Sequence, residues 1–261
     1  MNCINCGVGV TSKICPNCGQ TNPAKKINFK NMWFDFQSRI YGFDGMFPRT
    51  IRDLTIRPGI AAHEYIEGNR IKYYGPVGYF FLMITLVLLL LSLVEVSFYD
   101  LMIKSSTLTE IKENSGQEKF LKLFSEWIVN NMRIFSFLII PFSAIGSRII
   151  FRKSGLNLLE HSVLVFYTHG HIYWLTILSM FIFKFTGYNP FRSIQPLISI
   201  LLFGIGCSQL FNYQSKVKAF FKGLAVAVIG MLFFIFFLIA TGSTYFYFHP
   251  EYFELLRPKN N

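Results

Sequence analysis

Charged residues are scarce in this chain, and their scarcity excludes an ordinary soluble domain. Charged side chains make up 15% of the 261 residues, whereas hydrophobic residues make up 52% and aromatic residues 18%. A typical soluble domain carries about 25% charged residues. The apolar residues begin at Val77 and come in long runs, which is the pattern of a protein that crosses a membrane several times.

Several motifs of catalysis and nucleotide binding are also missing. The chain has no Walker loop, no Gly-x-Gly-x-x-Gly segment, no serine–histidine–aspartate elbow, and no HExxH or HxxxH pair. The first residues lack a basic start followed by an apolar run, so we expect no cleavable signal peptide. These absences favour a protein that is not an enzyme.

Four of the five cysteines lie in the first eighteen residues, in two Cys-x-x-Cys units separated by eight residues. Such pairs predict a metal site in a reducing compartment rather than disulfides. Four sulfurs suit a closed, structural zinc site, with iron as a minor alternative. A knuckle of about twenty residues buries too little surface to fold without its metal. The predicted ligands are Cys3, Cys6, Cys15 and Cys18.

The region that follows, residues 21–76, is predicted to hold a polar linker and amphipathic helices. Apolar residues at helical spacing between Phe29 and Ile40 indicate one such helix, and a second is expected over Met46–Ile56. Pro58 suits the first turn of another helix, and Gly68 can end it. The stretch Arg57–Pro76 is predicted to be a cytoplasmic interfacial segment. Its cations and tyrosines suit either anchoring at the bilayer surface or binding of an anionic ligand.

Residues 77–245 are predicted to form an all-α polytopic membrane domain with about five spans, followed by a short tail at 246–261. Glycines and Cys207 in the last two spans indicate close helix packing. An amphipathic helix is expected inside the Tyr99–Asn131 loop. The expected spans are Val77–Phe98, Met132–Phe151, Leu158–Phe183, Ile194–Phe211 and Gly223–Tyr245.

The net charge of +11 is explained best by basic loops on the cytoplasmic side of a membrane. Basic turns at Arg148–Lys153 and Lys216–Lys222 place the amino terminus in the cytoplasm and the carboxyl terminus outside. We expect the bacterial inner membrane. Nucleic acid is an unlikely partner, because the lysines near the cysteines lack interleaved aromatic residues for base stacking.

Ionisable residues in the third predicted span are candidates for function, because such groups are expensive inside a membrane. They are Glu160, His161, His169 and His171. His169 and His171 lie about 200° apart on a regular helix and cannot chelate one ion together. A metal or proton-relay site would need ligands from another span, such as Glu95 or Tyr167. The alternative is neutral histidine bonded to a neighbouring helix.

The order of these motifs resembles a bacterial family of integral membrane proteins known only as a domain of unknown function. The resemblance implies a zinc ribbon before a multi-span membrane domain, and it implies no activity, substrate or catalytic residue. The residues that carry it are Cys15-x2-Cys18-Gly19-Gln20, Arg57-Pro58-Gly59, Tyr65-Ile66-x-Gly68-x-Arg70-x-x-Tyr73-x-x-Pro76, Glu160-His161 and His169-x-His171.

Three functional hypotheses follow. The first is a non-enzymatic scaffold, anchor or sensor whose zinc ribbon docks a cytosolic protein. The second is a small transporter or channel in which His169, His171 and Glu95 line a polar path. The third is a membrane-embedded enzyme that acts on a lipid through the histidines and Arg70. The sequence leaves the oligomeric state open.

Overall fold

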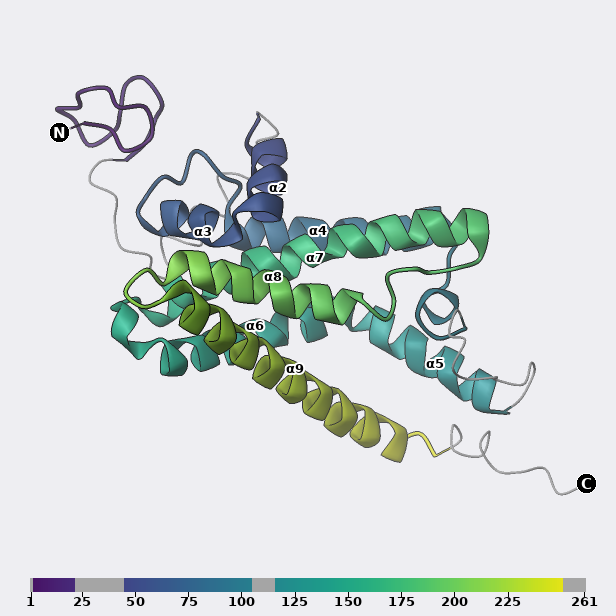
Figure 1. Ribbon diagram of the computed structural model, residues 1–261. Coiled ribbons are helices and arrows are strands. Elements are labelled where there is room, and N and C mark those ends of the chain that lie inside the picture. The colour runs from purple at the N-terminus through teal and green to yellow at the C-terminus, as the bar shows by residue number, and fades with distance from the viewer. Residues whose placement is uncertain (1, 22–44, 105–115, 251–261) are drawn as a thin grey trace, which may run out of the picture.

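The computed structural model describes residues 2–21, 45–104 and 116–250, and these residues are mostly helical (Figure 1). No β-strand occurs among them, although two isolated antiparallel bridges join Asn2 to Gly9 and Ile14 to Thr21. The helix predicted between Phe29 and Ile40, the linker from residue 22 onward and the tail from residue 251 onward lie outside the described residues. The helices are α2 (Met46–Ile56), α3 (Pro58–Ile66), α4 (Pro76–Leu93), η1 (Asp100–Lys104), α5 (Gly116–Asn130), α6 (Met132–Ile150), η2 (Arg152–Ser154), α7 (Leu158–Thr186), α8 (Gln195–Leu210) and α9 (Lys216–Tyr247).

Within the described part of the chain, three helices are long and apolar enough to cross a membrane: α4, α6 and α9. They correspond to three of the five predicted spans. The fourth prediction coincides with α8, which is apolar but has 16 residues and is shorter than a typical span. The third coincides with α7, which has 29 residues but carries many polar side chains.

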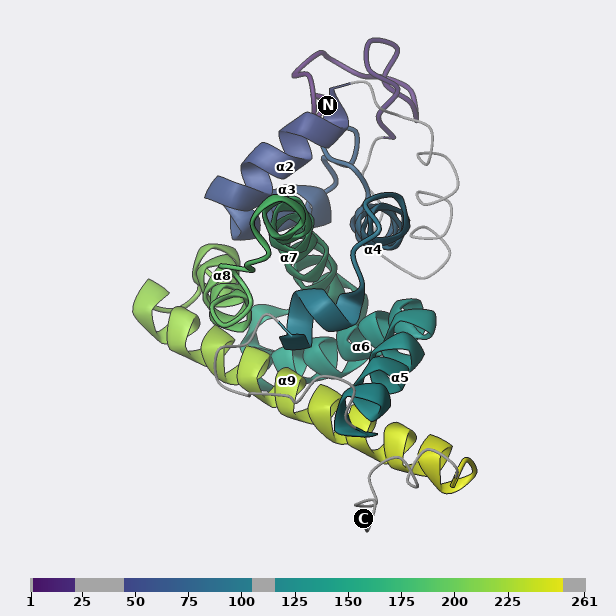
Figure 2. The same ribbon diagram turned by 90° about the vertical axis from the view of Figure 1, so that its right-hand side faces the viewer.

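Helix α7 lies at the centre of the bundle and contacts α4, α6, α8, α2 and α3. In the view of Figure 2, α4 and α7 are seen nearly end on, and α9 crosses the bundle obliquely. Many residues of α7 are fully buried, including Val163, Val165 and Tyr167. Polar groups on α7 can therefore bond to neighbouring helices. This buried position explains why α7 can be less apolar than α4, α6 and α9.

Glycine allows the helices to approach one another closely at several crossings. A Cβ atom on Gly59 would lie 2.0 Å from the carbonyl oxygen of Gly206, so α3 and α8 touch through their backbones. A Cβ on Gly223 would lie 2.8 Å from the Cβ of Cys207, where α9 meets α8. The close packing that the sequence predicts for the glycines and Cys207 is present at these crossings.

Local signals set the helix boundaries. Pro58 and Pro76 each stand at the start of a helix, where a missing N–H costs nothing. Gly68 has a φ of 108°, and it follows the end of α3. α2 has the bounds that the sequence predicts, and the predicted loop helix is α5. The first predicted span runs to Phe98, whereas α4 ends at Leu93 and exposed Glu95 takes a φ of 55° just beyond it.

Candidate functional site

Two features can carry function in the described residues: a cluster of four thiols at the amino terminus and a cluster of charged side chains on the helical cap formed by α2, α3 and the loop 67–75. Both lie at the same end of the molecule in Figures 1 and 2. The cap rests on α7 and α8.

The four predicted cysteine ligands converge. Their sulfur atoms all lie within 4.8 Å of one another, with Cys3 Sγ 3.5 Å from Cys18 Sγ and Cys6 Sγ 3.6 Å from Cys15 Sγ. Zn–S bonds of about 2.3 Å in a tetrahedron separate the sulfurs by about 3.8 Å. The thiols thus fit one tetrahedral metal ion.

Two matching turns position these thiols. The Gly7 N–H donates to the carbonyl of Cys3, and the Gly19 N–H donates to that of Cys15. Both glycines have φ near 73°, in the left-handed region where other residues are strained. A hydrogen bond from the backbone of Val8 lowers the pKa of the Cys6 thiol to about 6. Burial raises the pKa of the Cys18 thiol to about 11, so these two thiols of the cluster shift in opposite directions.

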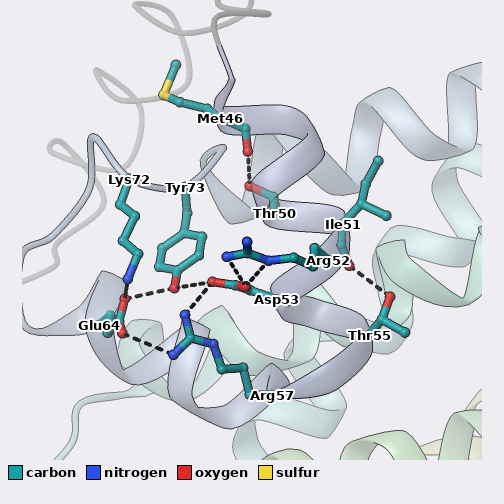
Figure 3. Close-up of polar contacts among 10 residues, drawn as sticks. All are labelled: Met46, Thr50, Ile51, Arg52, Asp53, Thr55, Arg57, Glu64, Lys72 and Tyr73. Carbon is teal, nitrogen blue, oxygen red and sulfur yellow. Dashed lines mark hydrogen bonds and ion pairs between the residues drawn. The ribbon is translucent and has the colours of Figure 1, made fainter.

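The charged cluster on the cap surrounds the hydroxyl of Tyr73 (Figure 3). This oxygen lies 2.9 Å from Asp53 Oδ2 and 2.7 Å from Glu64 Oε2. Arg57 bonds Asp53 at 2.8 Å and lies 3.9 Å from Glu64, and Lys72 bonds Glu64. Arg52 bonds the other oxygen of Asp53 at 2.9 Å. The cluster therefore ties α2, α3 and the loop before α4 together.

Burial and charge act in opposite directions on the two carboxyl groups. Burial would raise the pKa of Asp53, but hydrogen bonds from Arg57, Tyr73 and Arg52 hold it below its ordinary value. Burial would also raise the pKa of Glu64, but Lys72 and Tyr73 hold it low. Burial beside these two carboxylates raises the pKa of Tyr73, so its phenol stays protonated and donates.

Most of the residues that the sequence predicts as candidates for binding an anionic ligand already contact other groups of the protein. Arg57 and Lys72 are ion-paired inside the protein, and the Arg70 guanidinium lies 5.9 Å from the centre of the Tyr65 ring. Tyr73 and Tyr74 are buried within the protein. Sequence reasoning missed Asp53 and Glu64, since no motif marks either carboxylate as part of a site.

The structure separates the polar residues of the third predicted span. Glu160 and Asn157 form a capping box that starts α7. His161 bonds Ser147 of α6 at 2.9 Å, and His169 bonds the carbonyl of Val165 on its own helix at 3.0 Å. Each of these groups serves a different part of the fold, so they do not form one site.

His171 joins three helices. Its Nδ1 lies 2.9 Å from the Tyr79 hydroxyl on α4, and its Nε2 lies 3.0 Å from Thr55 Oγ1 on α2. The indole N–H of Trp174 also donates to the Tyr79 hydroxyl, at 3.2 Å. Tyr79 and Glu95 are sixteen residues apart in the chain, and sixteen residues span about 24 Å along a helix. Glu95 therefore does not join His171 in a polar path.

Residues 44–88 match the model of a family described as "Protein of unknown function (DUF3667)". The matched segment covers α2, α3, the loop 67–75 and most of α4, and it includes every residue of the charged cluster. The searches of curated proteins and of solved structures found no match to this chain.

Proposed function

We propose that this chain is a non-enzymatic membrane scaffold or sensor, with a structural zinc knuckle that docks a cytosolic protein. The observation that carries the proposal is the convergence of four thiols on a knuckle that sits on the helical cap. The charged side chains of the cap are paired with one another, which suits a rigid support better than a reaction centre.

The surface of the knuckle supports a docking role. Ile4, Val8 and Ile14 are exposed by 51%, 43% and 58% on a unit of about twenty residues. Three exposed apolar side chains on so small a unit favour contact with another protein. The Gln20 side chain bonds the Gly68 carbonyl of the cap and is buried, so it is not one of these exposed side chains.

The membrane arrangement belongs to the same proposal. We propose five spans, with α7 and α8 as the third and fourth, in the bacterial inner membrane. The basic residues at Arg152–Lys153 and Lys216–Lys222 support a cytoplasmic amino terminus and an external carboxyl terminus. α7 then crosses the bilayer shielded by other helices, where its polar groups find partners.

Site-specific photo-cross-linking in cells tests the docking role. A photoreactive residue at Ile14 should capture one discrete cytosolic protein, and the same residue at Phe185, which is 84% exposed on α7, should not. The Cys3→Ser variant should lose the cross-link because the knuckle loses its metal. A cross-link that persists without metal, or no cross-link from Ile14, contradicts the proposal.

A further inference from the structure

The knuckle is joined to the cap by Gln20, the residue directly after Cys18-Gly19. Its side-chain amide donates to the carbonyl of Gly68, in the loop between α3 and α4. Gln20 is 4% exposed, so this contact lies inside the protein. The partners are 48 residues apart in the chain, and they link the metal unit to the start of the first span.

The fold of the knuckle holds Gln20 in position. The carbonyl of Gln20 accepts a hydrogen bond from the Cys15 N–H at 2.8 Å, and Ile14 and Thr21 form a bridge around the same turn. These bonds close the second half of the knuckle around two of its four thiols. A unit of this size depends on its metal for folding, so the place of Gln20 depends on it too.

The loop that receives this bond leads directly to the charged cluster. The Asn69 N–H donates to the carbonyl of Glu64 at 2.9 Å, just beyond Gly68. Lys72 and Tyr73, three and four residues later, bond the carboxylate of the same Glu64. Gly68 is thus connected, through Asn69 and Glu64, to the side chains that hold α3 against α2 and the loop before α4.

Some polar atoms of Gln20 and of the loop lack hydrogen-bond partners in the described part of the chain. The Oε1 atom of Gln20 and the Oδ1 atom of Asn69 are buried without a hydrogen-bond partner in the part of the chain that the structure describes. A buried acceptor without a donor destabilises the contact that buries it. Acceptors without a donor in the described part of the chain oppose closure of this junction, which suits a contact that opens and closes.

We propose that Gln20 is a metal-dependent latch: with metal bound, it holds the loop 67–75 against α2 and α3, and loss of the metal releases the loop. The inference rests on the zinc knuckle of the proposed function. It adds that metal occupancy is transmitted within the chain to the base of α4. Because coupling between two equilibria is reciprocal, the closed loop also raises the affinity of the thiols for metal.

Hydrogen exchange of the full-length protein in detergent, read over residues 67–72, tests the latch. Removal of zinc from the wild type should raise exchange there about tenfold, the effect of one net hydrogen bond. The Gln20→Ala variant should keep one zinc per chain, show the raised exchange with zinc bound, and respond no further to chelation. Its zinc affinity should fall by the same factor. Gln117→Ala, at an exposed site on α5, is the matched control.

Two results would overturn the latch. One is a zinc-loaded Gln20→Ala variant whose loop exchanges like the wild type, and the other is a wild-type loop that ignores zinc removal. Either would leave the docking role intact, because that role is read from the Ile14 cross-link. If Cys3→Ser leaves the zinc content unchanged, the knuckle itself is wrong and both proposals fail.

Discussion

The hydroxyl of Tyr73 lies 2.7 Å from the carboxylate of Glu64, so the residue that leads into α4 is bonded to the helix before it. The same hydroxyl lies 2.9 Å from Asp53. One phenol hydroxyl thus lies between the buried carboxylate of Asp53 and the half-buried carboxylate of Glu64, while Arg57 and Lys72 balance their charge. This relationship makes the cap one unit and suggests the first prediction.

Replacing Tyr73 by Phe should lower the free energy of unfolding by about 1–3 kcal/mol, because the carboxylates lose a shared donor while the ring still fills its buried site. Thermal unfolding in detergent measures the effect. Tyr188→Phe, at a tyrosine that is 55% exposed, should change stability by less than about 0.5 kcal/mol. Equal effects of the two variants would contradict a special role for Tyr73.

The cap should lose stability in acid. The pKa values of Asp53 and Glu64 are lowered in the folded protein, so their contribution is fully present above the ordinary carboxyl pKa of about 4. It is lost as the pH falls through the lowered values. Stability measured from pH 7 to pH 3 should fall less steeply in Asp53→Asn than in the wild type. Glu126→Gln, at an exposed carboxylate, should keep the wild-type slope.

Gly59 should tolerate no side chain. A Cβ there would meet the Gly206 carbonyl at 2.0 Å and the Gln209 Cβ at 2.6 Å, so Gly59→Ala should push α3 away from α8. We expect a loss of about 1–3 kcal/mol in thermal unfolding. Gly146→Ala in α6 is the matched control, because its new Cβ would meet only Val226 at 3.8 Å. A stable Gly59→Ala protein would show that this helix crossing is wrong.

His171 should matter through its hydrogen bonds rather than through proton transfer. His171→Leu removes the links to Tyr79 and Thr55 and should cost about 1–3 kcal/mol of stability. His169→Leu should cost less, since His169 bonds only a carbonyl of its own helix. Full stability of His171→Leu together with loss of its cellular phenotype would favour the transporter or enzyme hypothesis instead.

Metal analysis tests the knuckle directly. The purified protein should carry one zinc per chain, and Cys3→Ser should carry much less, because three thiolates leave the tetrahedral site open. Cys207→Ser should keep its zinc, since Cys207 is buried between α8 and α9 far along the chain. Zinc content that does not depend on Cys3 would contradict the assignment.

Local patterns were enough to predict much of the helical framework. Pro58, Pro76 and Gly68 act on the backbone within a few residues of themselves, so their effects can be read from the chain. The spacing of the two Cys-x-x-Cys units likewise predicts that four thiols converge, as they do. Arg52 and Arg57 lie within four residues of Asp53. Tyr73 and Lys72, by contrast, come from a loop eight to twenty residues away from the carboxylates that they bond, and no local pattern marks those pairs.

The sequence by itself determined that this is a helical, membrane-type chain with a four-thiol knuckle, because hydropathy, helix signals and cysteine spacing are properties of neighbouring residues. Only the tertiary structure decided what the polar residues do. It bonds Tyr73 to Asp53, joins His171 to two other helices and bonds Gln20 to Gly68. Such contacts depend on how helices cross, and crossing is set by the packing of the whole bundle.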